Sequence, residues 1–139
     1  MMFLFRRSAR TKKASFFVNE TMKTPEFVIN YSEGLIRIKG KSIPEDSDRF
    51  YKPILEKLDW YVENAPDKTR VTVHFDYFNT TSSKYILKIF RHFEDIYKKY
   101  KDITIDWYYE ADDLDMMYCG EDFQSILNVP FNLVEIEEQ

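Results

Sequence analysis

A change of hydrophobic period within a few residues constrains this chain more than any other feature. Residues 71–77 alternate between apolar and polar side chains, which is typical of a β-strand with one buried face. From Ile86 to Tyr100 the apolar side chains instead recur at steps of three and four residues, which is typical of a helix. Residues 77–84, with the sequence Tyr-Phe-Asn-Thr-Thr-Ser-Ser-Lys, are therefore predicted to form a corner between a strand and a helix.

Four consecutive hydroxyl residues at this corner can serve two purposes. Thr80, Thr81, Ser82 and Ser83 follow Asn79, and side chains of these types accept hydrogen bonds from the unpaired N–H groups of a first helical turn. The helix dipole also makes the position favourable for an anion, such as a phosphate carried by one of the hydroxyls. Helix capping is the commoner role of such residues, and the corner alone favours it.

Length and composition indicate one globular domain. With 139 residues, 44% of them hydrophobic and 17% aromatic, the chain can fill a single core, and three Gly argue against a fibrous chain. Cys119 is the only cysteine, which excludes an intrachain disulfide. We therefore expect a reducing compartment such as the cytoplasm.

Charge is distributed unevenly along the chain. Residues 1–24 carry six Lys and Arg against Glu20, a net charge of +5, so the net charge of −4 for the whole chain leaves −9 for the remainder. An acidic body repels phosphate backbones, which argues against nucleic-acid binding by the domain. The apolar run 1–5 is too short for a membrane span. We expect residues 1–23 to be a basic, disordered extension, or the start site to be placed too early with Met22 as the true start, and we expect residues 24–139 to form one domain.

The remaining elements follow from the same patterns. Strands are expected at residues 27–31 and 35–39, joined as a hairpin, and at 70–77 and 103–109; helices are expected at 48–64, 81–100 and 113–127. In the two later strands the apolar residues occupy one face, which suits a sheet covered on one side. The sequence therefore predicts a two-layer α/β domain, with a mixed sheet of about four strands and helices mainly on one face.

Residues that could support catalysis or bind a metal are sparse. His74 and His92 lack the spacing to cysteines or carboxylates that a zinc site requires, and the cluster from Asp112 to Asp115 lacks the Gly and terminal Glu of a calcium loop. We therefore expect no metal, no cofactor and no enzymatic activity. The polar strand face around His74, Asp76 and Tyr108 keeps a small enzyme or a ligand-binding domain as the alternative function.

Several ordered motifs make the chain resemble a known family. They are Gly-Lys-Ser-Ile-Pro-Glu-Asp-Ser at residues 40–47 with Phe-Tyr-Lys-Pro-Ile at 50–54, Tyr-Phe-Asn-Thr at 77–80 with Ser-Ser-Lys at 82–84, Trp-Tyr-Tyr-Glu at 107–110 with Asp-Asp at 112–113, and Gly-Glu-Asp-Phe at 120–123 ahead of Pro-Phe at 130–131. In this order and spacing, from about residue 24 to residue 131, the chain resembles the SiaC family of bacterial regulatory phosphoproteins. The resemblance implies a fold similar to that of anti-sigma-factor antagonists, the STAS-like domains.

The resemblance also implies a partner-switching function. In the family, a dedicated serine/threonine kinase phosphorylates the threonine that follows the Asn of the Asn-Thr motif, and a PP2C-type protein phosphatase removes the phosphate. The unmodified form binds and activates an output enzyme, a diguanylate cyclase, which promotes cyclic di-GMP synthesis and biofilm behaviour. The acceptor corresponds to Thr80 in this sequence, and Thr81, Ser82 and Ser83 are the alternatives that the residues leave open.

The surface expected to bind partners combines two of these motifs. It comprises Asn79, Thr80, Ser82, Ser83 and Lys84 at the corner, and Pro44, Glu45 and Asp46 in the earlier motif. Asp46 stands where family members often have Asn, a departure that bears on the neighbouring surface. A phosphate on Thr80 would add about −1.5 to −2 charge and three acceptor oxygens at a helix start, so we expect it to act mainly on partner binding.

Overall fold

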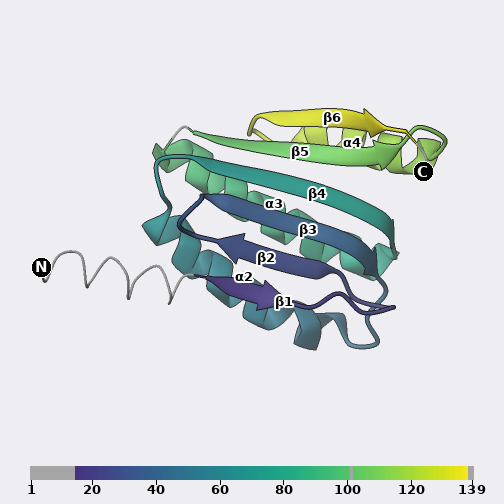
Figure 1. Cartoon of the computed structure of the whole chain (residues 1–139), viewed down its shortest axis with the longest axis horizontal. Coiled ribbons are helices and arrows are strands. Elements are labelled where there is room, and N and C mark those ends of the chain that lie inside the picture. The colour runs from purple at the N-terminus through teal and green to yellow at the C-terminus, as the bar shows by residue number, and fades with distance from the viewer. Residues whose placement is uncertain (1–14, 101, 138–139) are drawn as a thin grey trace, which may run out of the picture.

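The computed structural model describes residues 15–100 and 102–137, in which a six-stranded sheet is covered on one face by three helices (Figure 1). The strands follow one another across the sheet in sequence order: β1 (Phe16–Val18), β2 (Glu26–Asn30), β3 (Leu35–Ser42), β4 (Thr69–Phe78), β5 (Ile103–Glu110) and β6 (Phe131–Ile136). The helices are α2 (Ser47–Asn64), α3 (Thr80–Tyr100) and α4 (Leu114–Ile126). The predicted two-layer α/β class with a mixed sheet is confirmed.

The topology explains why the helices share one face. β1, β2 and β3 pair antiparallel, whereas β3, β4, β5 and β6 pair parallel. Each helix connects two adjacent parallel strands, and such crossovers are right-handed. Because the strand order advances in a single direction, all three crossovers place their helices on the same side of the sheet (Figure 1).

The core lies between the helices and the covered face of the sheet. The alternation predicted for β4 and β5 is confirmed, because six inward residues are at most 3% exposed: Val71, Val73, Phe75, Ile103, Ile105 and Trp107. His74 and Asp106 lie half-buried on the opposite face. The rings of Phe90, Phe123 and Phe131 surround Trp107 at centroid distances of 5.5 to 6.2 Å. This apolar layer is the main source of stability.

The strand count differs from the prediction of about four strands. Residues 16–18, which we expected within a disordered extension over residues 1–23, form β1 and pair with β2. β6 follows Pro130 and pairs with β5 in a segment for which we predicted no strand. The sheet therefore extends by one strand at each edge. Residues 1–14 of the expected extension lie outside the described residues.

Candidate functional site

The corner between β4 and α3 lies at the edge of the sheet where the parallel strands β3, β4 and β5 end, on the right of Figure 1. α3 begins at Thr80, directly after Asn79. Asn79 caps this helix, because its Oδ1 accepts the N–H of Ser82 at 2.8 Å and its carbonyl accepts the N–H of Ser83 at 3.1 Å. The predicted strand-to-helix corner is confirmed.

The hydroxyl groups of Thr80 and Thr81 are available at this corner. Both residues are exposed, and neither hydroxyl forms a hydrogen bond within the described part of the chain. The hydroxyl of Ser83 is engaged instead, since it donates to the Thr80 carbonyl at 2.6 Å and its side chain is half-buried. Two of the four predicted candidate acceptors therefore combine exposure with an unbonded hydroxyl.

Ser82 is a core residue. It is completely buried, its hydroxyl donates to the Ser42 carbonyl at 2.9 Å, and it accepts a hydrogen bond from the Ser42 hydroxyl at 2.8 Å. A kinase or a docking partner must reach the side chain that it recognises. The burial of Ser82 therefore argues against both roles that the sequence suggested for it, phosphoacceptor and exposed partner-binding residue.

The structure brings the two predicted segments of the docking surface together. β3 ends at Ser42, whose carbonyl also accepts the N–H of Asn79 at 3.1 Å. Four residues later Asp46 caps α2, because its Oδ1 accepts the N–H of Arg49 at 3.1 Å. The start of α2 and the start of α3 are thus joined through the end of β3, although the two segments lie more than thirty residues apart in the chain.

The other predicted docking residues are accessible to different degrees. Glu45, Asp46 and Lys84 are exposed, and Pro44 is half-buried. Lys84 follows Thr80 by four residues, so both side chains lie on the same face of α3. A phosphate on Thr80 would therefore have an ammonium group within reach.

A buried tyrosine underlies the corner. Tyr51 of α2 is 1% exposed, and its hydroxyl is hydrogen-bonded to that of Ser42. Its ring stacks on Tyr85 of α3, with centroids 5.1 Å apart, and the Tyr85 hydroxyl donates to Asp48 at 3.3 Å. Burial, partly offset by hydrogen bonding to Ser42 and Ser82, raises the pKa of the Tyr51 phenol. The phenol is therefore protonated, and a hydrogen-bond donor, at neutral pH.

Sequence reasoning missed Ser42 and Tyr51 as parts of this site. Both fall within the motifs at residues 40–47 and 50–54 on which the family resemblance depends, and this is the signal that could have found them. No local pattern pairs Ser42 with a serine forty residues later.

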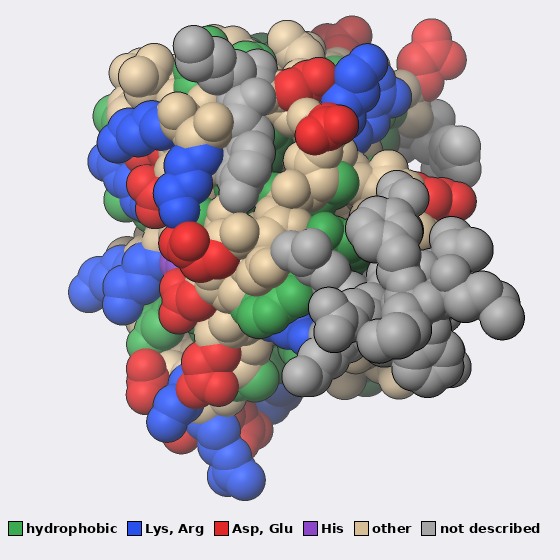
Figure 2. Space-filling view, turned by 90° about the vertical axis from the view of Figure 1, so that its left-hand side faces the viewer, with side chains coloured by type: hydrophobic (Ala, Val, Ile, Leu, Met, Phe, Trp, Pro, Cys, Tyr) green, Lys and Arg blue, Asp and Glu red, His purple; other side chains and the backbone are tan. Residues whose placement is uncertain are grey.

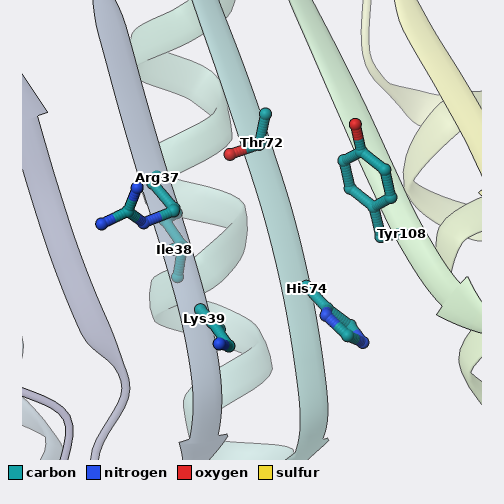
Figure 3. Close-up of a pocket in the computed structure, with 6 residues that line it drawn as sticks. All are labelled: Arg37, Ile38, Lys39, Thr72, His74 and Tyr108. Atoms are coloured by element: carbon teal, nitrogen blue, oxygen red, sulfur yellow. The ribbon is translucent and has the colours of Figure 1, made fainter. Parts of the chain in front are cut away.

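The open face of the sheet carries the residues of the alternative function. A hollow of about 290 Å³ lies on this face, and Figure 3 shows the residues that line it: Arg37, Ile38, Lys39, Thr72, His74 and Tyr108. His74 lies 3.5 Å from the carboxylate of Glu110, and Asp76 lines a second hollow nearer the end of β4. Side chains of adjacent strands form the lining, and the three described helices all lie on the other side of the sheet (Figure 1), so this site would bury less of a ligand than the enclosed pockets typical of enzymes.

Other chemical features are few. In the part of the chain covered by residues 15–100 and 102–137, no group of three or more His, Cys, Asp or Glu side chains could hold a metal ion. Burial, with the charges of Asp122, Asp115 and Asp113, raises the pKa of the half-buried Cys119 thiol, which disfavours a reactive thiolate. Figure 2 shows acidic and basic side chains interspersed at the end of the molecule where the parallel strands begin. Among the described helices, none is long and apolar enough to cross a membrane.

A comparison with protein families decides the family. The model of the SiaC family, described as SiaC family regulatory phosphoprotein, matches residues 18–136. This chain belongs to the SiaC family. The match includes the Asn79–Lys84 corner and the segment from Pro44 to Asp46, so both parts of the candidate site lie within the family domain.

Known structures share the fold of this family member. SiaC of Pseudomonas aeruginosa superposes with a TM-score of 0.79 at 18% identity, over 88% of this chain and 98% of that one. A chain in the crystal structure of the diguanylate cyclase SiaD in complex with its activator SiaC from Pseudomonas aeruginosa gives a TM-score of 0.81 at 18% identity, over 87% and 99% of the two chains. An uncharacterized protein of Pseudomonas aeruginosa strain UCBPP-PA14 is 20% identical over 118 residues, which are 85% of this chain and 94% of that protein.

Proposed function

We propose that this chain is a non-enzymatic regulatory phosphoprotein that works by partner switching in the cytoplasm. With an unmodified Thr80 it binds and activates an output enzyme, a diguanylate cyclase. A serine/threonine kinase phosphorylates Thr80 and weakens that complex, and a PP2C-type protein phosphatase restores it. The observation that carries this proposal is the exposed, unbonded hydroxyl of Thr80 at the first position of α3, in a member of a regulatory phosphoprotein family.

The surroundings of Thr80 suit a phosphate. The side chain of Asn79 caps the third residue of the helix, so the backbone N–H groups of Thr80 and Thr81 are left for another acceptor. The positive end of the α3 dipole lies at the same place, and Lys84 is one helical turn away. A phosphate could therefore be held at this corner without a rearrangement of the backbone.

The same phosphate would oppose docking of a partner. The start of α2, which is joined to the corner, already carries Glu45, Asp46 and Asp48 on its exposed surface. A dianionic group buried in an interface loses hydration, and it repels any acidic side chain that it meets. A penalty of about 1.4 kcal/mol is enough to lower the affinity tenfold. The modification therefore acts through binding and needs no change of fold.

The choice of output enzyme rests on the solved complex. In that complex SiaC is the activator of the diguanylate cyclase SiaD, and this chain shares the family and the fold of that activator. We therefore assign the same class of partner to this chain.

The acceptor can be tested by mapping phosphate on the protein made in its native host. Wild type, Thr80→Ala and Thr81→Ala are purified from that host, and phosphopeptides are identified by mass spectrometry. We expect phosphate on Thr80 in the wild type and in Thr81→Ala, and none at the corner in Thr80→Ala. The Thr81→Ala variant is the matched control, because Thr81 is equally exposed and unbonded.

The opposite pattern would contradict the assignment. Phosphate on Thr81 or Ser83 that is undiminished in Thr80→Ala would move the acceptor, and absence of phosphate from all corner hydroxyls would remove the switch. The output enzyme can be identified in the same host. When the Thr80→Ala protein is used as bait there, it should recover a diguanylate cyclase.

A further inference from the structure

Tyr51, Ser42 and Ser82 form a buried chain of hydroxyl groups beneath the corner. Ser42 and Ser82 are completely buried, and Tyr51 is 1% exposed. The three residues come from three different elements, namely α2, β3 and α3. Buried hydroxyl groups are stable when each proton and each acceptor is satisfied. The direction of each hydrogen bond among the three hydroxyl groups therefore shows how these elements are connected.

The direction of each hydrogen bond follows from the number of protons. Ser82 donates its single hydroxyl proton to the Ser42 carbonyl at 2.9 Å, and Ser42 donates its own to the hydroxyl oxygen of Ser82 at 2.8 Å. Since Ser42 has no second proton to give, the Tyr51 phenol must be the donor in its contact with Ser42. The hydrogen bonds therefore run in one direction, from α2 through β3 to α3 and back to the β3 backbone.

This chain of hydrogen bonds ends on the Ser42 carbonyl, which also binds the backbone segment that carries Thr80. The Ser42 carbonyl that accepts from Ser82 also accepts the N–H of Asn79 at 3.1 Å. The Asn79 side chain in turn accepts the N–H of Ser82 at 2.8 Å. Asn79 and Ser82 flank Thr80 and Thr81, so both ends of the acceptor segment are attached to β3.

We propose that Tyr51 is a positioning residue for the phosphorylation of Thr80, because through Ser42 and Ser82 it holds the first turn of α3 in the orientation that presents the Thr80 hydroxyl to the kinase. The inference rests on the proposed function of Thr80. Phosphoryl transfer requires the acceptor oxygen in line with the γ-phosphate, and a displacement of about 1 Å can reduce the rate a hundredfold.

Two substitutions separate this role from a general contribution to stability. Tyr51→Phe keeps the ring stacked on Tyr85 and removes the donor to Ser42. Tyr61→Phe is the matched control: Tyr61 lies in the same helix, is completely buried, and its hydroxyl contacts that of Thr69 at 2.9 Å, at the opposite end of β4. Each variant loses one buried, hydrogen-bonded phenolic hydroxyl, so a purely structural role would affect both to a similar extent.

The first measurement is amide hydrogen exchange, which needs no kinase. We expect Tyr51→Phe to accelerate exchange of the Ser82 and Ser83 amides about tenfold relative to wild type, because the first turn of α3 opens more often. Tyr61→Phe should leave these two amides within about threefold of wild type. Equal acceleration in both variants, or none in Tyr51→Phe, would overturn the positioning role.

The second measurement is the initial rate of Thr80 phosphorylation by a kinase fraction from the native host, over a range of protein concentrations. We expect the maximal rate for Tyr51→Phe to fall about fivefold while the half-saturating concentration stays near that of wild type, because the docking surface is intact and the acceptor is misplaced. Tyr61→Phe should behave as wild type. Equal rates in all three proteins would overturn the role of Tyr51 and leave the proposed function of Thr80 standing. Absence of phosphate from wild-type Thr80 would overturn both.

Discussion

At the scale of single residues, the four hydroxyls of the corner differ because helix geometry directs them differently. Thr80 and Thr81 face solvent, Ser82 faces the sheet, and Ser83 folds back onto a carbonyl of its own turn. Successive residues of an α-helix are separated by about 100°, so four neighbours sample the full circumference. The exposed hydroxyl residue Thr80 and the core residue Ser82 therefore lie only two positions apart.

This difference predicts unequal effects on stability within the corner. Ser82→Ala removes the acceptor for the buried Ser42 hydroxyl, so we expect the free energy of unfolding to fall by about 1–3 kcal/mol. Thr81→Ala removes an exposed hydroxyl without a partner and should change it by less than about 0.5 kcal/mol. Urea denaturation followed by tryptophan fluorescence measures both. Equal values for the two variants would show that the Ser42–Ser82 contacts contribute nothing.

The sequence predicted the corner well and its buried contacts poorly. The change of period located the start of α3 to within one residue, since hydrophobic periodicity is a local property. The burial of Ser82 depends on Ser42 and Tyr51, which lie forty and thirty-one positions away in the chain. Such long-range pairing leaves no mark on local periodicity, so the local pattern alone does not distinguish the buried Ser82 from the other three hydroxyl residues.

At the scale of elements, α4 approaches the sheet closely at Gly120. A Cβ on this glycine would lie 2.5 Å from Cδ1 of Trp107 and 2.7 Å from Cδ2 of Leu133. One turn earlier, the Met116 carbonyl accepts the indole N–H of Trp107 at 3.0 Å. The helix is therefore held against β5 and β6 by a close contact and a hydrogen bond at neighbouring positions.

A methyl group at this contact should destabilise the domain. Gly120→Ala overpacks the helix against Trp107, and we expect a loss of about 1–3 kcal/mol in the free energy of unfolding. Helix propensity acts in the opposite direction, since Ala is a better helix former than Gly by about 1 kcal/mol. Glu121→Ala, at the adjacent exposed position, is the control and should be nearly neutral. A net gain in stability for Gly120→Ala, measured by thermal unfolding, would show that α4 shifts freely on the sheet.

The elements that the sequence did not predict are the two edge strands. β1 has three residues, which is too short for an alternation to be recognised. In β6, Leu133, Val134 and Ile136 are all half-buried, so the two faces of the strand do not differ clearly in polarity. The inner strands and the helices α2 and α3 have strong periodicity, α4 has a weaker one, and all of them were placed to within a few residues.

At the scale of the whole molecule, the one-sided sheet separates two exposed regions. The open face carries the hollow around His74, whereas the edge at which the parallel strands end carries both parts of the candidate docking surface. In open α/β sheets, ligands are bound beyond the carboxyl ends of the strands, because the loops there converge. The corner, the start of α2 and the buried hydroxyls beneath them all lie at that edge.

In the proposed function, phosphate on Thr80 controls the affinity for the output enzyme. Phosphothreonine is installed at position 80 by genetic code expansion, and the diguanylate cyclase recovered from the native host is titrated calorimetrically with the modified and the unmodified protein. We predict that the dissociation constant of the modified protein is larger by a factor of about ten or more, equivalent to a loss of about 1.4 kcal/mol in binding free energy. Phosphatase treatment should restore the original affinity. Equal affinity of the two forms for the cyclase would contradict the proposed function.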